Sequence, residues 1–222
     1  MTPSSLQLLQ ESLWPLFEGM ILGTIPLTAI SFVLGLAIAL VVALARISSV
    51  KILRFLAATY VSVIRGTPLL LQLFIIFYGL PSFGIVLDPW PSAIAAFSLN
   101  VGGYAAEIIR AAINSIPKGQ WEAAATVGLS RFQALRWVII PQASRVALPP
   151  LSNTLISLVK DTSLASAVLV TEIIRKAQEL AAPTFQFFLL YGLAAIYYWV
   201  VSQALTFGQT RLEKVLDKKV AH

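Results

Sequence analysis

An arginine and an aspartate stand out in this sequence because each lies within an otherwise apolar segment. Arg65 directly precedes Gly66-Thr67-Pro68, and Asp161 lies in the short polar run 160–163. A guanidinium can hold a carboxylate through two parallel hydrogen bonds, and a carboxylate can accept hydrogen bonds from an ammonium group. If Arg65 and Asp161 converge, they predict a site for a zwitterion such as an amino acid. The alternative is that the two residues, or Lys160 and Asp161 with their neighbours, only neutralise one another.

Further polar side chains fall on shared helical faces near these two charges. Asn100, Tyr104 and Glu107 are spaced by four and three residues, and so place their side chains along one wall of a helix. Glu107 and Arg110 are three apart, and we expect them to pair as a structural or gating contact. The predicted substrate-binding set is Arg65, Thr67, Gln72, Asn100, Tyr104, Thr154, Ser157, Asp161, Thr162 and Ser163. The alternative for the uncharged members is hydrogen bonding that holds helices together.

The run Gly66-Thr67-Pro68 also predicts a broken helix. Proline removes a backbone donor and clashes with the preceding turn, while glycine reaches dihedral angles that other residues avoid. Breaks of this kind are tolerated at membrane depth where the freed backbone groups face a cavity or a ligand. A proline kink that only shapes packing is the other possibility.

Composition indicates the elements that must position these residues. Hydrophobic residues make up 58% of the 222 residues and charged residues 12%, which is typical of a polytopic membrane protein. Cysteine is absent and the one histidine is His222, so no catalytic residues and no metal site are predicted. The formal charge is +6, and most of the basic residues behind it lie in loops between the apolar stretches or in the C-terminal tail, where membrane proteins carry them. This placement argues against nucleic acid as a partner.

Five apolar stretches are long enough to cross about 30 Å of hydrocarbon as helices. The loops after the first and third stretches and the C-terminal tail are basic, so the N-terminus is predicted outside and the C-terminus inside. Residues before the first stretch are expected at the outer interface. We predict an all-α membrane protein with a single domain over 1–222, a cytoplasmic loop at 115–141, and transmembrane helices at about 19–45, 55–80, 90–114, 142–167 and 186–208.

The cytoplasmic loop contains a second informative pattern. Glu122 begins an alanine-rich helical turn, Gly128 permits close backbone approach or a bend, and Pro141 suits the start of the next helix. We expect one helix over about 121–135. The proposed coupling residues are Glu122, Ala123, Ala124, Gly128, Arg131 and Pro141.

Five segments in order resemble motifs of the permeases of bacterial ABC importers for polar amino acids, the histidine, glutamine, arginine and cystine group. They are Arg65–Leu69, Tyr104–Glu107, Gly119–Ala124, Ile140–Ala143 and Lys160–Leu164. The resemblance implies a type I importer transmembrane domain in the bacterial inner membrane. It also implies a second permease copy or paralogue, two cytoplasmic ATPase subunits, and a periplasmic or lipid-anchored binding protein. No phosphate-binding loop occurs in the sequence, so ATP and Mg are assigned to the partner ATPase.

Within this group of permeases, the residue type at Thr154 indicates which class of amino acid is transported. Arginine-type relatives carry an acidic residue near this position, and a threonine there disfavours a cationic side chain. Further runs, including Tyr78–Ile85 and Ala147–Asn153, are most similar to L-cystine permeases. We predict L-cystine, with glutamine or another neutral polar amino acid as the alternative. An ion-coupled secondary transporter is the alternative of a different class, although it would not need the coupling loop.

Overall fold

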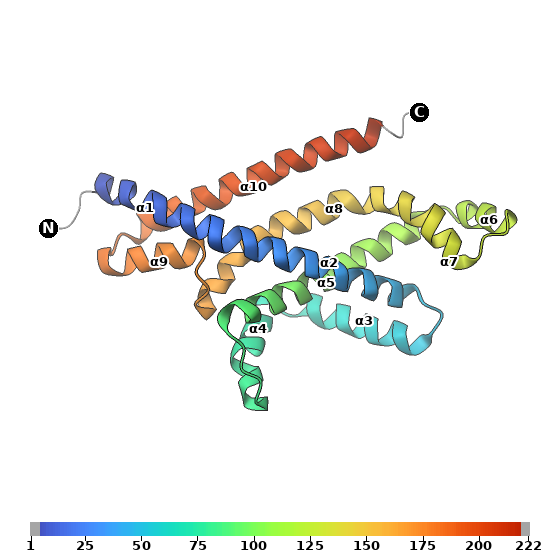
Figure 1. Ribbon diagram of the computed structural model, residues 1–222, viewed down its shortest axis with the longest axis horizontal. Helices are drawn as coiled ribbons and strands as arrows, with labels where there is room; N and C mark the ends of the chain where they lie inside the picture. The colour runs from blue at the N-terminus through green and yellow to red at the C-terminus, as the bar shows by residue number, and fades with distance from the viewer. Residues whose placement is uncertain (1–4, 219–222) are drawn as a thin grey trace.

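The computed structural model describes residues 5–218 of the chain, and side chains for residues 5–214. The described chain is built from helices with no strand, and most of them run roughly along one long axis (Figure 1). The α-helices are α1 (Ser5–Gly19), α2 (Ile25–Ile47), α3 (Lys51–Gly66), α4 (Leu69–Phe74), α5 (Pro89–Ser115), α6 (Lys118–Thr126), α7 (Arg131–Ala134), α8 (Ile140–Asp161), α9 (Ile173–Thr184) and α10 (Phe187–Lys218).

Short π-helical and 3-10 turns join several of these helices. The π-helical turns are Met20–Thr24, Ile75–Gly79 and Leu135–Ile139, and the 3-10 turns are Leu80–Phe83 and Thr162–Val168. Because these turns keep the chain helical, α1 and α2 form one helical stretch from Ser5 to Ile47, and α7 runs into α8.

Within the described residues 5–218, three to five helical segments are long and apolar enough to cross a membrane. Three are single stretches, at Ser5–Ile47, Pro89–Ser115 and Phe187–Lys214. Two more are pairs of helical segments that meet at a bend. Lys51–Gly66 and Leu69–Phe83 meet at 107°, and Arg131–Val168 and Ile173–Thr184 meet at 48°. The predicted break at Pro68 is therefore present, and the five predicted spans correspond to the upper count.

The predicted helix bounds need correction at both ends of the chain. The first helix begins at Ser5 rather than at residue 19, because apolar residues such as Leu8 and Leu16 pack against α9 and α10. Its 43 residues span roughly 65 Å, about twice the hydrocarbon thickness. The last helix continues past residue 208 to Lys218, and α9 was not predicted at all.

The main core lies where α2 crosses α5. Gly35 of α2 faces Val101, and a Cβ added at Gly35 would lie 2.5 Å from Val101 Cγ1. On α5, Gly102 faces Ile38 and Tyr60 with similarly little space. Small residues let two backbones approach closely, which gives membrane helices their packing contacts in the absence of a hydrophobic drive between them. This contact holds α5 rigidly beside the broken helix.

Candidate functional site

The break between α3 and α4 is braced by one buried glutamine. Thr67 and Pro68 are extended, as expected for proline and the residue before it. The Gln72 side-chain amide donates to the Ile64 carbonyl at 2.8 Å, the Thr67 carbonyl at 3.1 Å and the Thr67 hydroxyl at 2.9 Å. Its Oε1 accepts from Asn100 Nδ2 at 3.1 Å, which links the break to α5. Gln72 thus satisfies backbone groups that the break leaves unpaired.

A cavity of about 440 Å³ opens beside this break, between the start of α4, α5 and the second half of α8. Its wall is mostly polar side chains alternating with a few apolar ones. The residues that line it are Thr67, Pro68, Leu69, Asn100, Val101, Tyr104, Asn153, Thr154, Ser157, Leu158 and Asp161. The structure therefore brings together six of the ten residues that the sequence predicts for substrate binding.

The other four predicted residues lie outside the cavity wall. Gln72 braces the break instead, and the hydroxyls of Thr162 and Ser163 donate to the carbonyls of Val159 and Lys160, each at 2.7 Å. Both residues begin the 3-10 turn after α8, and residues one and two positions after Asp161 do not share its helical face. Arg65 is the fourth.

Arg65 reaches the edge of the cavity through an aromatic ring. Its guanidinium carbon lies 5.5 Å from the ring centre of Tyr104, a cation–π distance, and Tyr104 lines the cavity. Neither Arg65 nor Asp161 forms an ion pair with any described side chain, so the two do not pair with each other. The charge of the adjacent Lys160 still acts on the Asp161 carboxylate. The carboxylate of Asp161 is left to face the cavity.

Asn153 is a lining residue that the predicted set missed. It shares a helical face with Ser157 and Asp161 at spacings of four, and it directly precedes Thr154. Asn153 and Thr154 both border the cavity. The Thr154 hydroxyl donates to the Pro150 carbonyl at 3.0 Å, so its oxygen retains acceptor capacity.

Glu107 lies one turn further along α5, towards the basic end of the bundle. The expected pair with Arg110 is confirmed, with Arg110 Nε 3.0 and 3.1 Å from the two carboxylate oxygens. Arg46 of α2 adds a second contact to Glu107 at 3.3 Å. These partners tie α2 to α5 at one end of the core, which agrees with a structural contact rather than a ligand contact.

The predicted coupling helix is two helices rather than one over 121–135. The α6 helix ends in a Schellman motif, in which Gly128 has φ +82° and the Leu129 N–H donates to the Ala124 carbonyl at 3.1 Å. Ser130 and Gln133 then form a capping box that starts α7. Gly128 supplies the bend that its type allows, and this bend divides the helix.

Most of the proposed coupling residues face outwards at the tip of the molecule (Figure 1). Glu122, Ala123 and Gly128 are exposed, whereas Ala124 is buried and anchors α6. Pro141 stands in the first turn of α8, as predicted. The α6 helix is fastened to α8 by Gln142 Nε2, which donates to Gln120 Oε1 at 3.1 Å and to the Val138 carbonyl at 2.9 Å.

Long apolar helices, a polar cavity beside a broken helix and an exposed helical tip are typical of a membrane permease. The chain belongs to the family of binding-protein-dependent transport system inner membrane components, which it matches over residues 31–218. It is therefore a membrane permease component of the ABC transporter class, with the type I importer fold.

Two curated relatives and one solved structure are similar over nearly the whole chain. The L-cystine transport system permease protein TcyB of Bacillus subtilis is 56% identical over 215 residues, which cover 96% of this chain and 92% of that protein. The glutamine transport system permease protein GlnP of Escherichia coli is 36% identical over 92% of this chain and 95% of its own length. The crystal structure of an amino acid ABC transporter with histidines has a TM-score of 0.89 at 34% identity, covering 96% and 99% of the two chains.

Proposed function

We propose that this chain forms the translocation pathway of an ATP-driven amino acid importer whose substrate is L-cystine. The observation that carries the proposal is the polar cavity that presents the unpaired Asp161 carboxylate, with Arg65 at its edge. Asp161 would accept from the α-ammonium group and Arg65 would hold the α-carboxylate. The 56% identity to a permease named for L-cystine supports that cargo.

The charges of the cavity favour a neutral polar side chain over a cationic one. Asp161 is the one carboxylate on the described wall, and the α-ammonium group would occupy it. A cationic side chain would then lack a counter-charge, which is costly at membrane depth. Cystine has a zwitterionic group at each end, so a two-fold permease dimer with two Arg65–Asp161 sites matches its symmetry. Relatives named for glutamine support glutamine as the second candidate.

The proposed assembly contains two copies of this chain, two cytoplasmic ATPase subunits that bind ATP and Mg, and an external binding protein. The family name supports a binding protein as partner. Basic residues in the loops at 46–54 and 118–145 support a cytoplasmic position for α6 and α7, with the N-terminus outside and the C-terminus inside the bacterial inner membrane. ATP binding would close the ATPase dimer, and the docked α6 helices would tilt the permeases to face outwards.

Uptake by the complete complex in proteoliposomes tests the substrate. We expect labelled cystine to be taken up and to be competed best by unlabelled cystine, less by glutamine and little by arginine. The binding protein should be supplied in excess, so that the permease is saturated. Preferred uptake of arginine would contradict the argument from Thr154 and Asp161, and preferred uptake of glutamine would favour the second candidate.

The energy source separates this proposal from an ion-coupled transporter. With the complex in proteoliposomes, removal of internal ATP should stop uptake while an imposed Na⁺ or H⁺ gradient should not restore it. Uptake that continued without ATP under a constant gradient would overturn the ABC mechanism for this chain.

Gly128 offers a test of the coupling segment. A Cβ at Gly128 would meet nothing within 4 Å, so a substitution there acts only through the positive φ. We expect Gly128→Val to cost roughly 1–2 kcal/mol in the Schellman turn and to lower uptake per ATP hydrolysed several-fold. The measurement is uptake and ATPase activity in the same proteoliposomes.

Gly119→Val is the matched control, because Gly119 lies in α6 with equally open surroundings and without a positive φ. It should leave the ratio of uptake to hydrolysis unchanged. An unchanged ratio in Gly128→Val as well would argue against α6 and its cap as the coupling element.

A further inference from the structure

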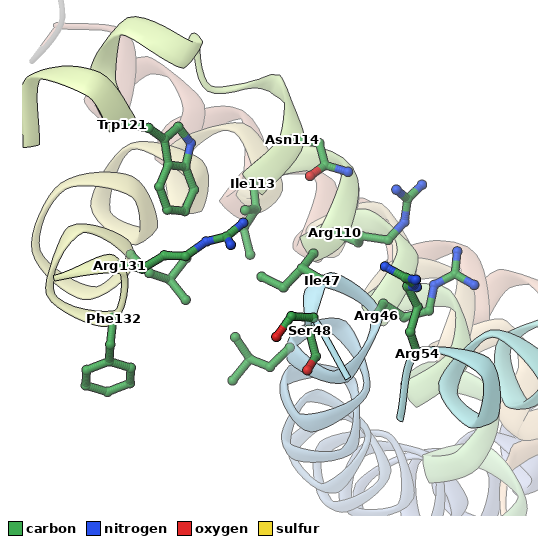
Figure 2. Close-up of a pocket in the computed structure, with 13 residues that line it drawn as sticks. Arg46, Ile47, Ser48, Arg54, Arg110, Ile113, Asn114, Trp121, Arg131 and Phe132 are labelled. Carbon is green, nitrogen blue, oxygen red and sulfur yellow. The ribbon is translucent and has the colours of Figure 1, made fainter. Parts of the chain in front are cut away.

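Four arginines surround a second cavity, of about 550 Å³, at the basic end of the bundle. They come from separate parts of the chain: the end of α2, the start of α3, the last turns of α5 and the start of α7. Figure 2 shows the guanidinium groups of Arg46, Arg54 and Arg110 gathered at one side of the cavity, while Arg131 extends from the opposite wall beside Trp121. The fold thus brings four positive charges to the wall of one cavity.

This positive charge is only partly balanced. Glu107 pairs with Arg46 and Arg110, but among the described side chains no carboxylate pairs with Arg54 or Arg131. Two of the four guanidinium groups therefore share one carboxylate, and the other two have no carboxylate partner among the described side chains. Positive charges gathered around one cavity repel one another, a bound anion relieves this repulsion, and guanidinium groups match the oxygens of a phosphate particularly well.

An apolar groove of about 190 Å³ continues from this cavity into the bundle. The two share Leu44 and Ile113 as walls. The groove then runs along α2, α5 and α8 past Leu40, Ile109 and Leu151, and its lining side chains expose only apolar surface. A basic cavity at the end of the helices thus joins an apolar channel that leads towards their middle.

We propose that this composite site binds an anionic phospholipid, with the headgroup phosphate beside the gathered arginines Arg46, Arg54 and Arg110 and one acyl chain in the groove. A soluble phosphate would use the arginines but not the groove, and an acidic segment of a partner protein would likewise gain nothing from the groove. The first turns of α3 beside the cavity expose Ile52, Phe55 and Leu56, which suits a position at the lipid boundary. The proposed topology places the lipid in the cytoplasmic leaflet, whose anionic lipids attract basic residues at the membrane surface.

The test measures lipid retained by the complete importer complex. The complex is equilibrated with equal amounts of dioleoylphosphatidylglycerol and dioleoylphosphatidylcholine in mixed micelles, and the bound lipids are counted by native mass spectrometry. We expect phosphatidylglycerol to be retained in preference to phosphatidylcholine. Arg54→Gln should lower the retained phosphatidylglycerol about tenfold, because it removes one charge-assisted contact to the phosphate. Arg145→Gln is the control, since Arg145 is exposed on α8 and does not line the cavity.

A second pair of variants tests the groove separately. Ser144→Phe places a ring in the groove from an exposed position and should also lower phosphatidylglycerol retention several-fold, whereas Val146→Phe, exposed but outside the groove, should not. Equal retention of the two lipids, or no effect of Arg54→Gln, would overturn the proposal. So would displacement of phosphatidylglycerol by millimolar glycerol 3-phosphate with no effect of Ser144→Phe, which would indicate a soluble anion. Loss of the ATPase subunits from Arg54→Gln with normal lipid retention would instead indicate an acidic protein partner and would also overturn it.

Discussion

Asp161→Asn is expected to lower ATP-driven cystine uptake roughly 10- to 100-fold while the permease still assembles with its ATPase subunits. The range corresponds to the loss of one hydrogen bond to a charged group, about 1.5–3 kcal/mol, at about 1.4 kcal/mol for each tenfold change. Asparagine keeps the shape of the side chain and its place on the cavity wall. Because Asp161 has no ion-pair partner among the described side chains, the substitution breaks no ion pair within the protein.

The measurement is initial uptake over a range of binding-protein concentrations, with size-exclusion chromatography of the complex as the assembly check. Asp88→Asn is the control: the same chemical change at an exposed aspartate before α5, away from the cavity. Normal uptake by Asp161→Asn would show that the Asp161 carboxylate does not bind the substrate. If the variant no longer assembled with its ATPase subunits on size-exclusion chromatography, Asp161 would instead have a structural role in the helix bundle.

The wall of the cavity was largely predictable because helical periodicity decides which side chains share a face. Asn100 and Tyr104 are four apart, as are Ser157 and Asp161, and each pair lines the cavity. The break at Pro68 was predictable too, since it follows from the chemistry of proline at that position. Gln72 was misplaced because its role depends on which carbonyls the break frees, and periodicity carries no such information.

The predicted helix bounds are wrong where tertiary packing, or the backbone conformation of a single residue, overrides the local sequence pattern. Residues 5–18 are helical because α9 and α10 cover one side of them, a contact between segments more than 150 residues apart, as in the Glu18–Lys176 ion pair at 3.0 Å. The division of α6 from α7 follows from one residue, Gly128, adopting a positive φ. The arginine cavity draws its residues from two stretches far apart in the sequence, 44–54 and 110–135, so local spacing could not have shown that they meet.

Gly23→Ala is expected to have the largest effect on the stability of the bundle. Gly23 lies in the π-helical turn between α1 and α2, directly against the loop that leads into α9. A Cβ there would lie 2.3 Å from the Thr171 carbonyl oxygen and 2.7 Å from the Glu172 Cα. Both neighbours are backbone atoms, so no side-chain rotation can make room.

The backbone opposite Gly23 is itself firmly held. Glu172 is buried, and its carboxylate accepts from the N–H groups of Ile174 and Arg175 at 2.9 and 2.8 Å and from the hydroxyl of Tyr198 on α10. These contacts fix the start of α9 and tie it to α10. An added methyl group must therefore push α1–α2 away from α9, which loosens the packing of three helices together.

Overpacking of this kind costs roughly 1–3 kcal/mol, so Gly23→Ala should lower the midpoint of thermal unfolding by several degrees. The measurement is the fraction of detergent-purified permease that elutes as a single species after heating. Gly192→Ala is the matched control, because Gly192 lies within α10 with nothing within 4 Å of an added Cβ, and it should be as stable as the parent or slightly more so. If the two variants unfolded at the same temperature, the contact between Gly23 and Thr171–Glu172 would not hold the N-terminal helix in place, and Ser5–Gly19 would be expected to separate from α9 without loss of the remaining fold.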